Sequence, residues 1–101
     1  MVIYTVKINI NETIHDEWLN WMISEHIPEV MNTGCFSAYG IFKLLLPETH
    51  SGITYVIQYE CRSSEDYLKY REKFASTLQA KHSEKFDGKF TAERSLMEKL
   101  G

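Results

Sequence analysis

The sequence predicts an α+β fold in which the elements follow the order strand, helix, strand, strand, helix, strand. Three observations predict it: apolar residues alternate in four segments, they recur at helical spacing in two others, and polar turns separate the segments. No repeat, low-complexity tract or linker divides the 101 residues. We therefore expect a single domain that spans residues 1–101.

The first predicted strand covers residues 2–10. Every second side chain is apolar from Val2 to Ile10, whereas Lys7 and Asn9 belong to the opposite set. This period of two, rich in β-branched residues, is typical of a strand with one buried face.

The first predicted helix follows Asn11 and Thr13, either of which can cap its N-terminus. Residues at steps of three and four would form its buried face: Ile14, Trp18, Trp21, Met22 and Glu25. Because Pro28 disfavours helical geometry at the residue before it, we expect the helix to break at Ile27. A short turn then ends at Gly34.

The second and third predicted strands, residues 35–46 and 53–61, form an antiparallel hairpin around a polar turn. Both faces of the second strand are apolar, which predicts cover on both sides. Gly40 within it indicates a bulge or the close approach of another group.

The second predicted helix begins at Ser63, which has capping-box spacing to Asp66. It should end near Ser83, and a turn at residues 86–88 leads to the last strand at residues 90–97. The buried face of this helix would carry Tyr67, Tyr70, Phe74, Leu78 and either Lys81 or His82.

Two strand–helix–strand halves joined by a hairpin pack most compactly as a ferredoxin-like βαββαβ fold. Right-handed crossovers place both helices on one face of a four-stranded antiparallel sheet. The other face is then left open, and we expect it to carry Ile3, Thr5, Tyr39, Ile41, Leu45, Thr54 and Val56. A surface this apolar predicts a homodimer through the open sheet face. The alternative is a solvated face, helped by polar residues such as Lys7 and Gln58.

The composition and the length of the apolar runs argue against nucleic acid and membranes as partners. A net charge of −3 leaves no basic surplus for binding nucleic acid. The apolar runs are far shorter than the roughly 18 residues of a membrane span, and the N-terminus does not have the pattern of a signal peptide. We therefore expect a cytoplasmic protein. Cys35 and Cys61 are interpreted as free thiols, and their proximity is left open.

The segments 21–28 (WMISEHIP) and 33–36 (TGCF), within this element order, resemble the dimeric α+β-barrel superfamily. The chain is most similar to an uncharacterised bacterial branch of it, a domain of unknown function. It is distantly similar to antibiotic-biosynthesis monooxygenases and EthD-like proteins, in which a tryptophan and a histidine end the first helix in a similar way. The resemblance implies a dimer and a small organic molecule bound between helices and sheet.

His26 is the candidate catalytic residue. In EthD-like proteins a similarly placed histidine faces the pocket, so the resemblance implies the same orientation here. A neutral imidazole can act as a general base near pH 7, and the neighbouring Glu25 would orient it. The alternative is a histidine that hydrogen-bonds the free carbonyl groups at the helix end.

An aromatic pocket for a small apolar or aromatic ligand is expected between the helices and the sheet. The same side chains could equally form an ordinary core. The predicted walls are Tyr4, Trp18, Trp21, Met22, Phe42, Tyr55 and Tyr59.

The sequence predicts no metal and no cofactor. His82 raises the question of haem, because haem-degrading members of the superfamily use an axial histidine in the second half of the chain. However, no tryptophan follows Trp21. The four histidines lack metal-ligand spacing, and His15 and His50 are expected to be exposed.

The sequence is compatible with three functions. The first is small-molecule binding without catalysis. The second is a cofactor-free monooxygenase or isomerase/cyclase that acts on an aromatic or quinone-like compound, and the third is a structural or regulatory dimer. A sizeable closed cavity lined by His26 and a tyrosine would favour the enzyme, a cavity without titratable groups the binder, and a filled core the third function.

Overall fold

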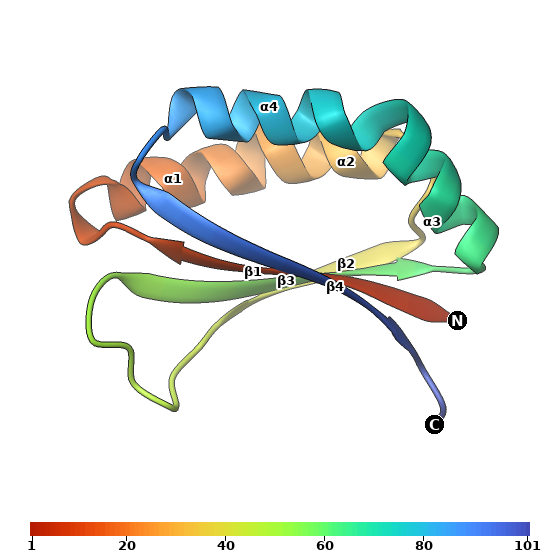
Figure 1. The fold of residues 1–101 in the computed structure, drawn as a ribbon, viewed down its shortest axis with the longest axis horizontal. Coiled ribbons are helices and arrows are strands. Elements are labelled where there is room, and N and C mark those ends of the chain that lie inside the picture. Colours follow the sequence, from red (N-terminus) through yellow and green to blue (C-terminus); the bar gives the residue numbers. More distant parts are fainter.

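The computed structural model describes residues 1–101 and confirms the ferredoxin-like α+β architecture (Figure 1). Its four strands are β1 (Val2–Ile10), β2 (Ala38–Lys43), β3 (Ile53–Cys61) and β4 (Phe90–Glu98). They lie in the order β2-β3-β1-β4, and every neighbouring pair is antiparallel. The predicted hairpin between the second and third strands is therefore present.

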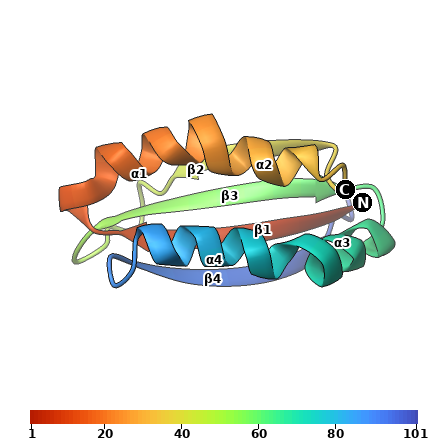
Figure 2. The same cartoon turned by 90° about the horizontal axis from the view of Figure 1, so that it is seen from above.

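Two long helical segments cover one face of the sheet, as both views show (Figures 1 and 2). Figure 2 shows the first segment along β2 and β3, and the second along β1 and β4. The first segment consists of η1 (Glu12–Ile14), α1 (His15–Trp21), η2 (Met22–His26) and α2 (Ile27–Asn32). The second consists of α3 (Ser64–Tyr70), η3 (Arg71–Ala75) and α4 (Ser76–Lys85). No helix combines the length and the apolar character that crossing a bilayer requires.

Side-chain caps begin both segments where the sequence predicts them. Asn11 Oδ1 accepts a hydrogen bond from the backbone N–H of Thr13 at 2.8 Å, so Asn11, rather than Thr13, is the first cap. Ser63 Oγ accepts one from the backbone N–H of Asp66 at 3.3 Å. These bonds satisfy N–H groups that have no partner within the helix.

The predicted helix break at Ile27 is wrong, because a π turn carries the helix through this region. In η2 the N–H of Ile27 donates to the carbonyl of Met22, five residues earlier, and Pro28 lies in the first turn of α2. A wider turn accommodates the local disruption that a proline brings to a helix. The backbone hydrogen bonds shift to a five-residue spacing there, and the helix continues instead of ending.

The π turn also changes which side chains face the sheet. An α-helical spacing places Glu25 on the buried face, but Glu25 is exposed, and Ile27 and Val30 are fully buried. The extra residue in the turn rotates everything after it, and His26 becomes partly buried. The prediction that Glu25 lies on the buried face was therefore wrong, because the π turn adds one residue to the helical repeat at this point.

The core lies between the helices and the inner face of the sheet. The alternation predicted for β1 is confirmed, since Tyr4, Val6, Ile8 and Ile10 are all buried there. From the other helical segment, Tyr70, Leu78 and His82 are buried, which settles the choice between Lys81 and His82. Cys35 and Cys61 are buried free thiols.

The open face of the sheet carries a mixture of apolar and polar side chains. Ile3, Thr5, Thr54 and Val56 lie on it as predicted, because Ile3 and Thr5 pair with Glu60 and Gln58, and Thr54 and Val56 pair with Asn9 and Lys7. On β2 and β4 this face carries Ala38, Gly40, Phe42, Thr91, Glu93, Ser95 and Met97.

The predicted faces of β2 were wrong. Tyr39 pairs with Tyr59 and Ile41 with Ile57, on the side of the helices, whereas Phe42 pairs with Val56 on the open face. Both sets of side chains in this strand are apolar, so the pattern alone could not decide between the faces, and a slip of one residue exchanges them. Leu45 lies beyond the strand and is 73% exposed.

Gly40 provides the close approach that its position in the strand indicated. The ring of Phe42 lies over it, and a Cβ at residue 40 would come within 2.9 Å of two ring carbons. The outer end of the aromatic ring therefore leans over residue 40 and occupies the space that a side chain there would need.

Gly52, in the turn between β2 and β3, has a positive φ of 70°, and a Cβ there would lie 2.5 Å from Asn9 Oδ1. Gly88 has nearly the same φ, 71°, with open space around it. We expect Gly88→Ala to cost only the left-handed backbone penalty of about 1–2 kcal/mol. Gly52→Ala should cost more, because it also displaces the end of β1. Urea unfolding of the two variants measures the difference, and equal losses would contradict the predicted clash.

Candidate functional site

Two histidines and several aromatic rings meet between the helical segments and the sheet, and we call this group the imidazole cluster. His26 lies at the end of η2 and His82 in α4, with 5.8 Å between their ring centroids. The other members are Trp18, Trp21, Phe86 and Phe90. The cluster thus joins both helical segments to the start of β4.

A buried hydrogen bond fixes His82. The indole Nε1–H of Trp18 donates to His82 Nε2 at 2.9 Å, and the His82 ring packs perpendicular to Phe90 with 4.3 Å between centroids. Since Nε2 is the acceptor, the neutral ring carries its proton on Nδ1. The same bond occupies the nitrogen that an axial bond to haem iron would need, so this arrangement does not fit the haem interpretation.

His26 is held mainly by stacking. Its ring lies against Trp21 with 5.0 Å between centroids and an interplanar angle of 23°. These residues are five apart, the spacing that a π turn brings onto one side of a helix. His26 Nδ1 is buried and has no hydrogen-bond partner. The predicted orientation by Glu25 was wrong, since that carboxylate is exposed, and the side chain does not bond the carbonyl groups at the helix end either.

Burial keeps both imidazoles neutral. It lowers the pKa of His26 to about 4, against an opposing effect of the Glu29 carboxylate and with smaller contributions from Arg94 and Lys81. Burial likewise lowers the pKa of His82 to about 4, with smaller contributions from the neighbouring His26 and Arg94. The cluster therefore presents two uncharged rings at neutral pH.

A small cavity of about 30 Å³ lies beside the cluster. Its polar lining consists of His26, Gln79 and the tyrosines at positions 4, 59 and 70; the remaining walls are Val6, Ile8, Met22, Val30 and Ile57. Burial raises the pKa of Tyr59 and Tyr70, so their hydroxyl groups stay protonated and can donate hydrogen bonds. The cavity has room for about one water molecule.

The structure brings together some of the predicted pocket residues. Tyr4, Met22 and Tyr59 line the cavity with His26, and Trp21 stacks on His26. Trp18 and Tyr55 are buried next to each other, with 5.1 Å between their ring centroids, but neither lines the cavity. Phe42 was wrongly placed, because it lies on the opposite face of the sheet and is 53% exposed.

Sequence reasoning missed Gln79 of α4 and left His82 as one of two alternatives for the buried face of the second predicted helix. Gln79 lines the cavity, and the role of His82 follows from its bond to Trp18. Only the helical step from Leu78 to His82 could have indicated that this histidine points inward. His15 was also misjudged: it is partly buried, with Nε2 2.6 Å from Tyr55 Oη and Nδ1 3.1 Å from Asp16 Oδ1.

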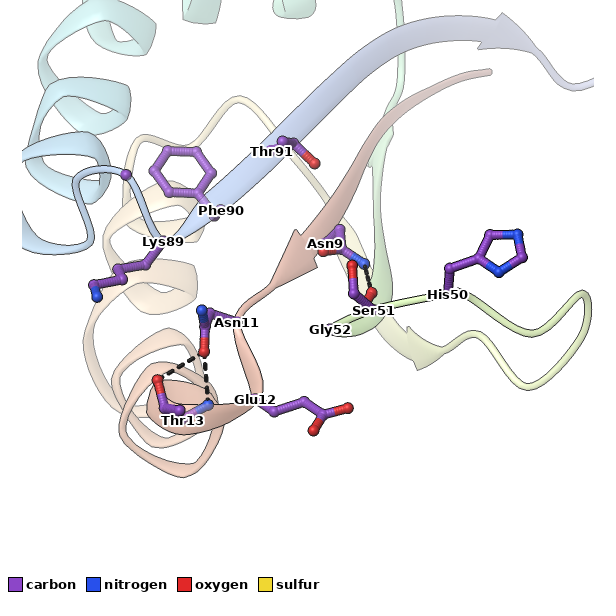
Figure 3. Close-up of a pocket in the computed structure, with 11 residues that line it drawn as sticks. Asn9, Asn11, Glu12, Thr13, His50, Ser51, Gly52, Lys89, Phe90 and Thr91 are labelled. Atoms are coloured by element: carbon purple, nitrogen blue, oxygen red, sulfur yellow. Dashed lines mark hydrogen bonds between the residues drawn. The ribbon is translucent and has the colours of Figure 1, made fainter.

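A larger but open groove of about 540 Å³ lies at one end of the sheet (Figure 3). Figure 3 shows that its sides come from the end of β1, the turn before β3 and the start of β4. Asn9 Nδ2 donates to the carbonyl of Ser51 at 3.0 Å, and Asn11 caps the first helix there. These polar groups bond to one another and hold the loops, so the groove lacks the free buried polar atom that distinguishes the cavity at His26.

No group of three or more histidine, cysteine, aspartate or glutamate side chains is arranged to hold a metal ion. The lining of the cavity offers hydrogen-bonding groups and aromatic contacts.

Solved structures of the same fold show what this chain is similar to. An EthD-family protein from Bacillus halodurans C-125 has 12% sequence identity and a TM-score of 0.72 over 99% of this chain and 100% of that one. A dimeric ferredoxin-like protein from an uncultured marine organism has 14% identity and a TM-score of 0.72, covering 100% and 96%. A Deinococcus radiodurans protein described as a candidate antibiotic biosynthesis monooxygenase has 12% identity and a TM-score of 0.72, covering 100% and 94%.

At these identities the similarity shows the fold alone. Among curated protein sequences, none matches this chain. One family does match nearly all of it: a family described as a domain of unknown function, DUF4286, aligns with residues 1–100.

The neutral imidazoles predict how stability depends on pH. Between pH 6.5, the ordinary pKa of histidine, and about pH 4, these two histidines bind protons in the unfolded chain but stay unprotonated in the folded protein. Their contribution to the free energy of unfolding should therefore be complete above pH 6.5. It should fall as the pH drops to 4, by about 1.4 kcal/mol per pH unit for each imidazole. Urea unfolding across this range measures the slope.

His82→Gln keeps an acceptor for Trp18 but cannot titrate, and it should remove about half of that slope. His50→Gln, in an exposed loop, is the matched control and should leave the slope unchanged. Equal slopes in both variants would show that His82 is not held neutral in the native state.

Proposed function

The chain belongs to the DUF4286 family, and we propose that it is a cytoplasmic homodimer that binds a small organic molecule between its helices and its sheet, beside His26. The family description names no activity, so the proposal depends on the geometry of this chain.

One observation carries the proposal: His26 Nδ1 is buried without a partner in the wall of a cavity. A buried polar atom without a hydrogen bond costs about 1–3 kcal/mol, so folded proteins rarely keep one without a reason. A ligand atom in the cavity would satisfy the imidazole, and the tyrosine hydroxyls and the Gln79 amide around it could bond the same molecule. Aromatic walls with a few converging polar groups are typical of sites for small organic ligands.

The size of the cavity restricts how a ligand enters. About 30 Å³ accepts a water molecule or a single small group, so a larger molecule must displace part of the wall. Trp21, His26 and Gln79 are only partly buried, unlike the buried tyrosines of the cavity wall. Movement of these side chains can enlarge the site without disturbing the sheet.

Catalysis by a cofactor-free monooxygenase or isomerase/cyclase is the second candidate. The neutral imidazole beside three tyrosines favours it, as does the fold shared with a candidate antibiotic biosynthesis monooxygenase. However, an effective general base has a pKa near the working pH, and that of His26 is about 4. Small-molecule binding is therefore favoured over catalysis in which His26 removes a proton from a substrate.

The open face of the sheet supports the dimer. Phe42 and Met97 are 53% and 45% exposed there, beside the partly buried Ile3 and Val56. Burying even ~400 Å² of apolar surface is worth about 10 kcal/mol before the cost of association. The fold is also shared with a dimeric ferredoxin-like protein. A dimer whose surface alone is functional remains the alternative if the cavity binds nothing.

Phe42 and Tyr39 give a matched test of the interface. They lie in the same strand with similar exposure, 53% and 46%, but on opposite faces. Phe42→Glu should shift the protein from dimer to monomer, because it buries a charge between the sheets. Tyr39→Glu should leave the dimer intact. Light scattering coupled to size-exclusion chromatography measures the mass, and a wild-type monomer at micromolar concentration would refute the dimer.

Small aromatic probes test the site itself. Phenol, indole and naphthoquinone titrated into ¹⁵N-labelled protein should shift the imidazole signals of His26 and His82 and the indole signal of Trp21. The signals of His50, far along the exposed loop, serve as the internal control. If all three probes leave the cluster unmoved, or shift His50 equally, the proposed binding site is wrong.

A further inference from the structure

Arg94 lies on the inner face of the edge strand β4, the side that the helices cover. It pairs with Val6 of β1 and is diagonal to Tyr4, and both of these partners line the cavity. The chain around Arg94 thus places a long cationic side chain at the border of the proposed site, and the residue itself is exposed.

The guanidinium of Arg94 has no acidic partner. The structure contains two ion pairs, His15 with Asp16 and Lys81 with Glu29 at 2.7 Å, and neither involves Arg94. Its neighbours on the same face of β4 are Ala92 and Leu96, and the residue opposite is aliphatic. Lys81, the other cation near the cluster, is already paired.

The groups that face Arg94 are neutral and can donate or accept hydrogen bonds. The strand register places Arg94 beside Val6 and Tyr4, and its charge contributes to the pKa shifts of Tyr4, Tyr70, His26 and His82. Both imidazoles are uncharged, and burial raises the pKa of both tyrosines. Because the nearby Glu29 and Lys81 pair with each other, the site combines one unpaired positive charge with several hydrogen-bond donors, the arrangement that suits an anion.

Resting on the proposed function, we infer that Arg94 binds the carboxylate of a small organic acid whose apolar end enters the cavity beside His26. The fork of N–H donors on arginine matches the two oxygens of a carboxylate, whereas a lysine provides only a point charge. One guanidinium balances one negative charge, which favours a monocarboxylate over a phosphate. The apolar walls, Val6 and Met22 among them, suit an aliphatic or aromatic body.

A series of acids and neutral amides separates charge recognition from cavity filling. Acetate, butyrate, hexanoate and benzoate are titrated into the ¹⁵N-labelled protein at constant ionic strength, each alongside its primary amide. We expect the acids to bind at least tenfold more tightly than the amides, as a charge-assisted hydrogen bond predicts. The affinity should rise with the length of the apolar tail, and the signals of Arg94 and His26 should shift together.

Variants of two arginines provide the matched comparison. Arg94→Gln should weaken hexanoate binding by about tenfold or more and leave hexanamide binding unchanged. Arg94→Lys should recover only part of the affinity, because the charge returns without the fork. Arg71→Gln removes the same charge from an exposed position in η3 and should bind like wild type.

The outcomes distinguish this inference from the proposed function. Amides that bind as tightly as acids, with the cluster signals shifted, would keep the binding site and refute the role of Arg94. An equal loss in the Arg94 and Arg71 variants would show that only net charge matters, and would also refute it. A change of oligomeric state in Arg94→Gln would assign the side chain to the subunit interface instead. If neither acids nor amides shift the cluster, both the inference and the proposed site fail.

Discussion

The hydrogen bond between Trp18 and His82 is the buried polar contact that joins the two helical segments. Breaking it would leave either an indole N–H or an imidazole nitrogen without a partner inside the protein, and such groups are costly. The bond also fixes the tautomer of His82 and holds its ring against Phe90, at the start of the edge strand. The position of α4 over β1 and β4, and hence the wall of the cavity, depends on this contact.

Much of the fold follows from local patterns in the sequence. The alternation in β1 predicted its buried face, and the Asn11 and Ser63 caps formed at the expected helix starts. These features depend on residues close together in the chain, so a single sequence contains enough information to predict them. The order of the elements then left few ways to arrange one sheet and two helices.

The errors occurred where two arrangements were locally equivalent. Apolar side chains occupy both faces of β2, so only pairing with β3 shows that Ile41 faces the helices and Phe42 does not. The π turn is similar: Pro28 signals a disturbance, but the sequence does not say whether the helix ends or widens. Because the helix widens, His26 rather than Glu25 turns inward, and the imidazole meets Trp21 instead of a carboxylate.

Gly40 has a consequence for the thickness of the molecule on its open side. With no side chain at this position, the outer end of the Phe42 ring leans over the backbone and occupies the space that a Cβ would need. Two sheets that pack face to face are separated by about 10 Å, a gap that upright aromatic rings on both sides would widen. The absence of one methyl group at Gly40 therefore keeps this part of the surface shallow enough for another layer of protein to approach closely.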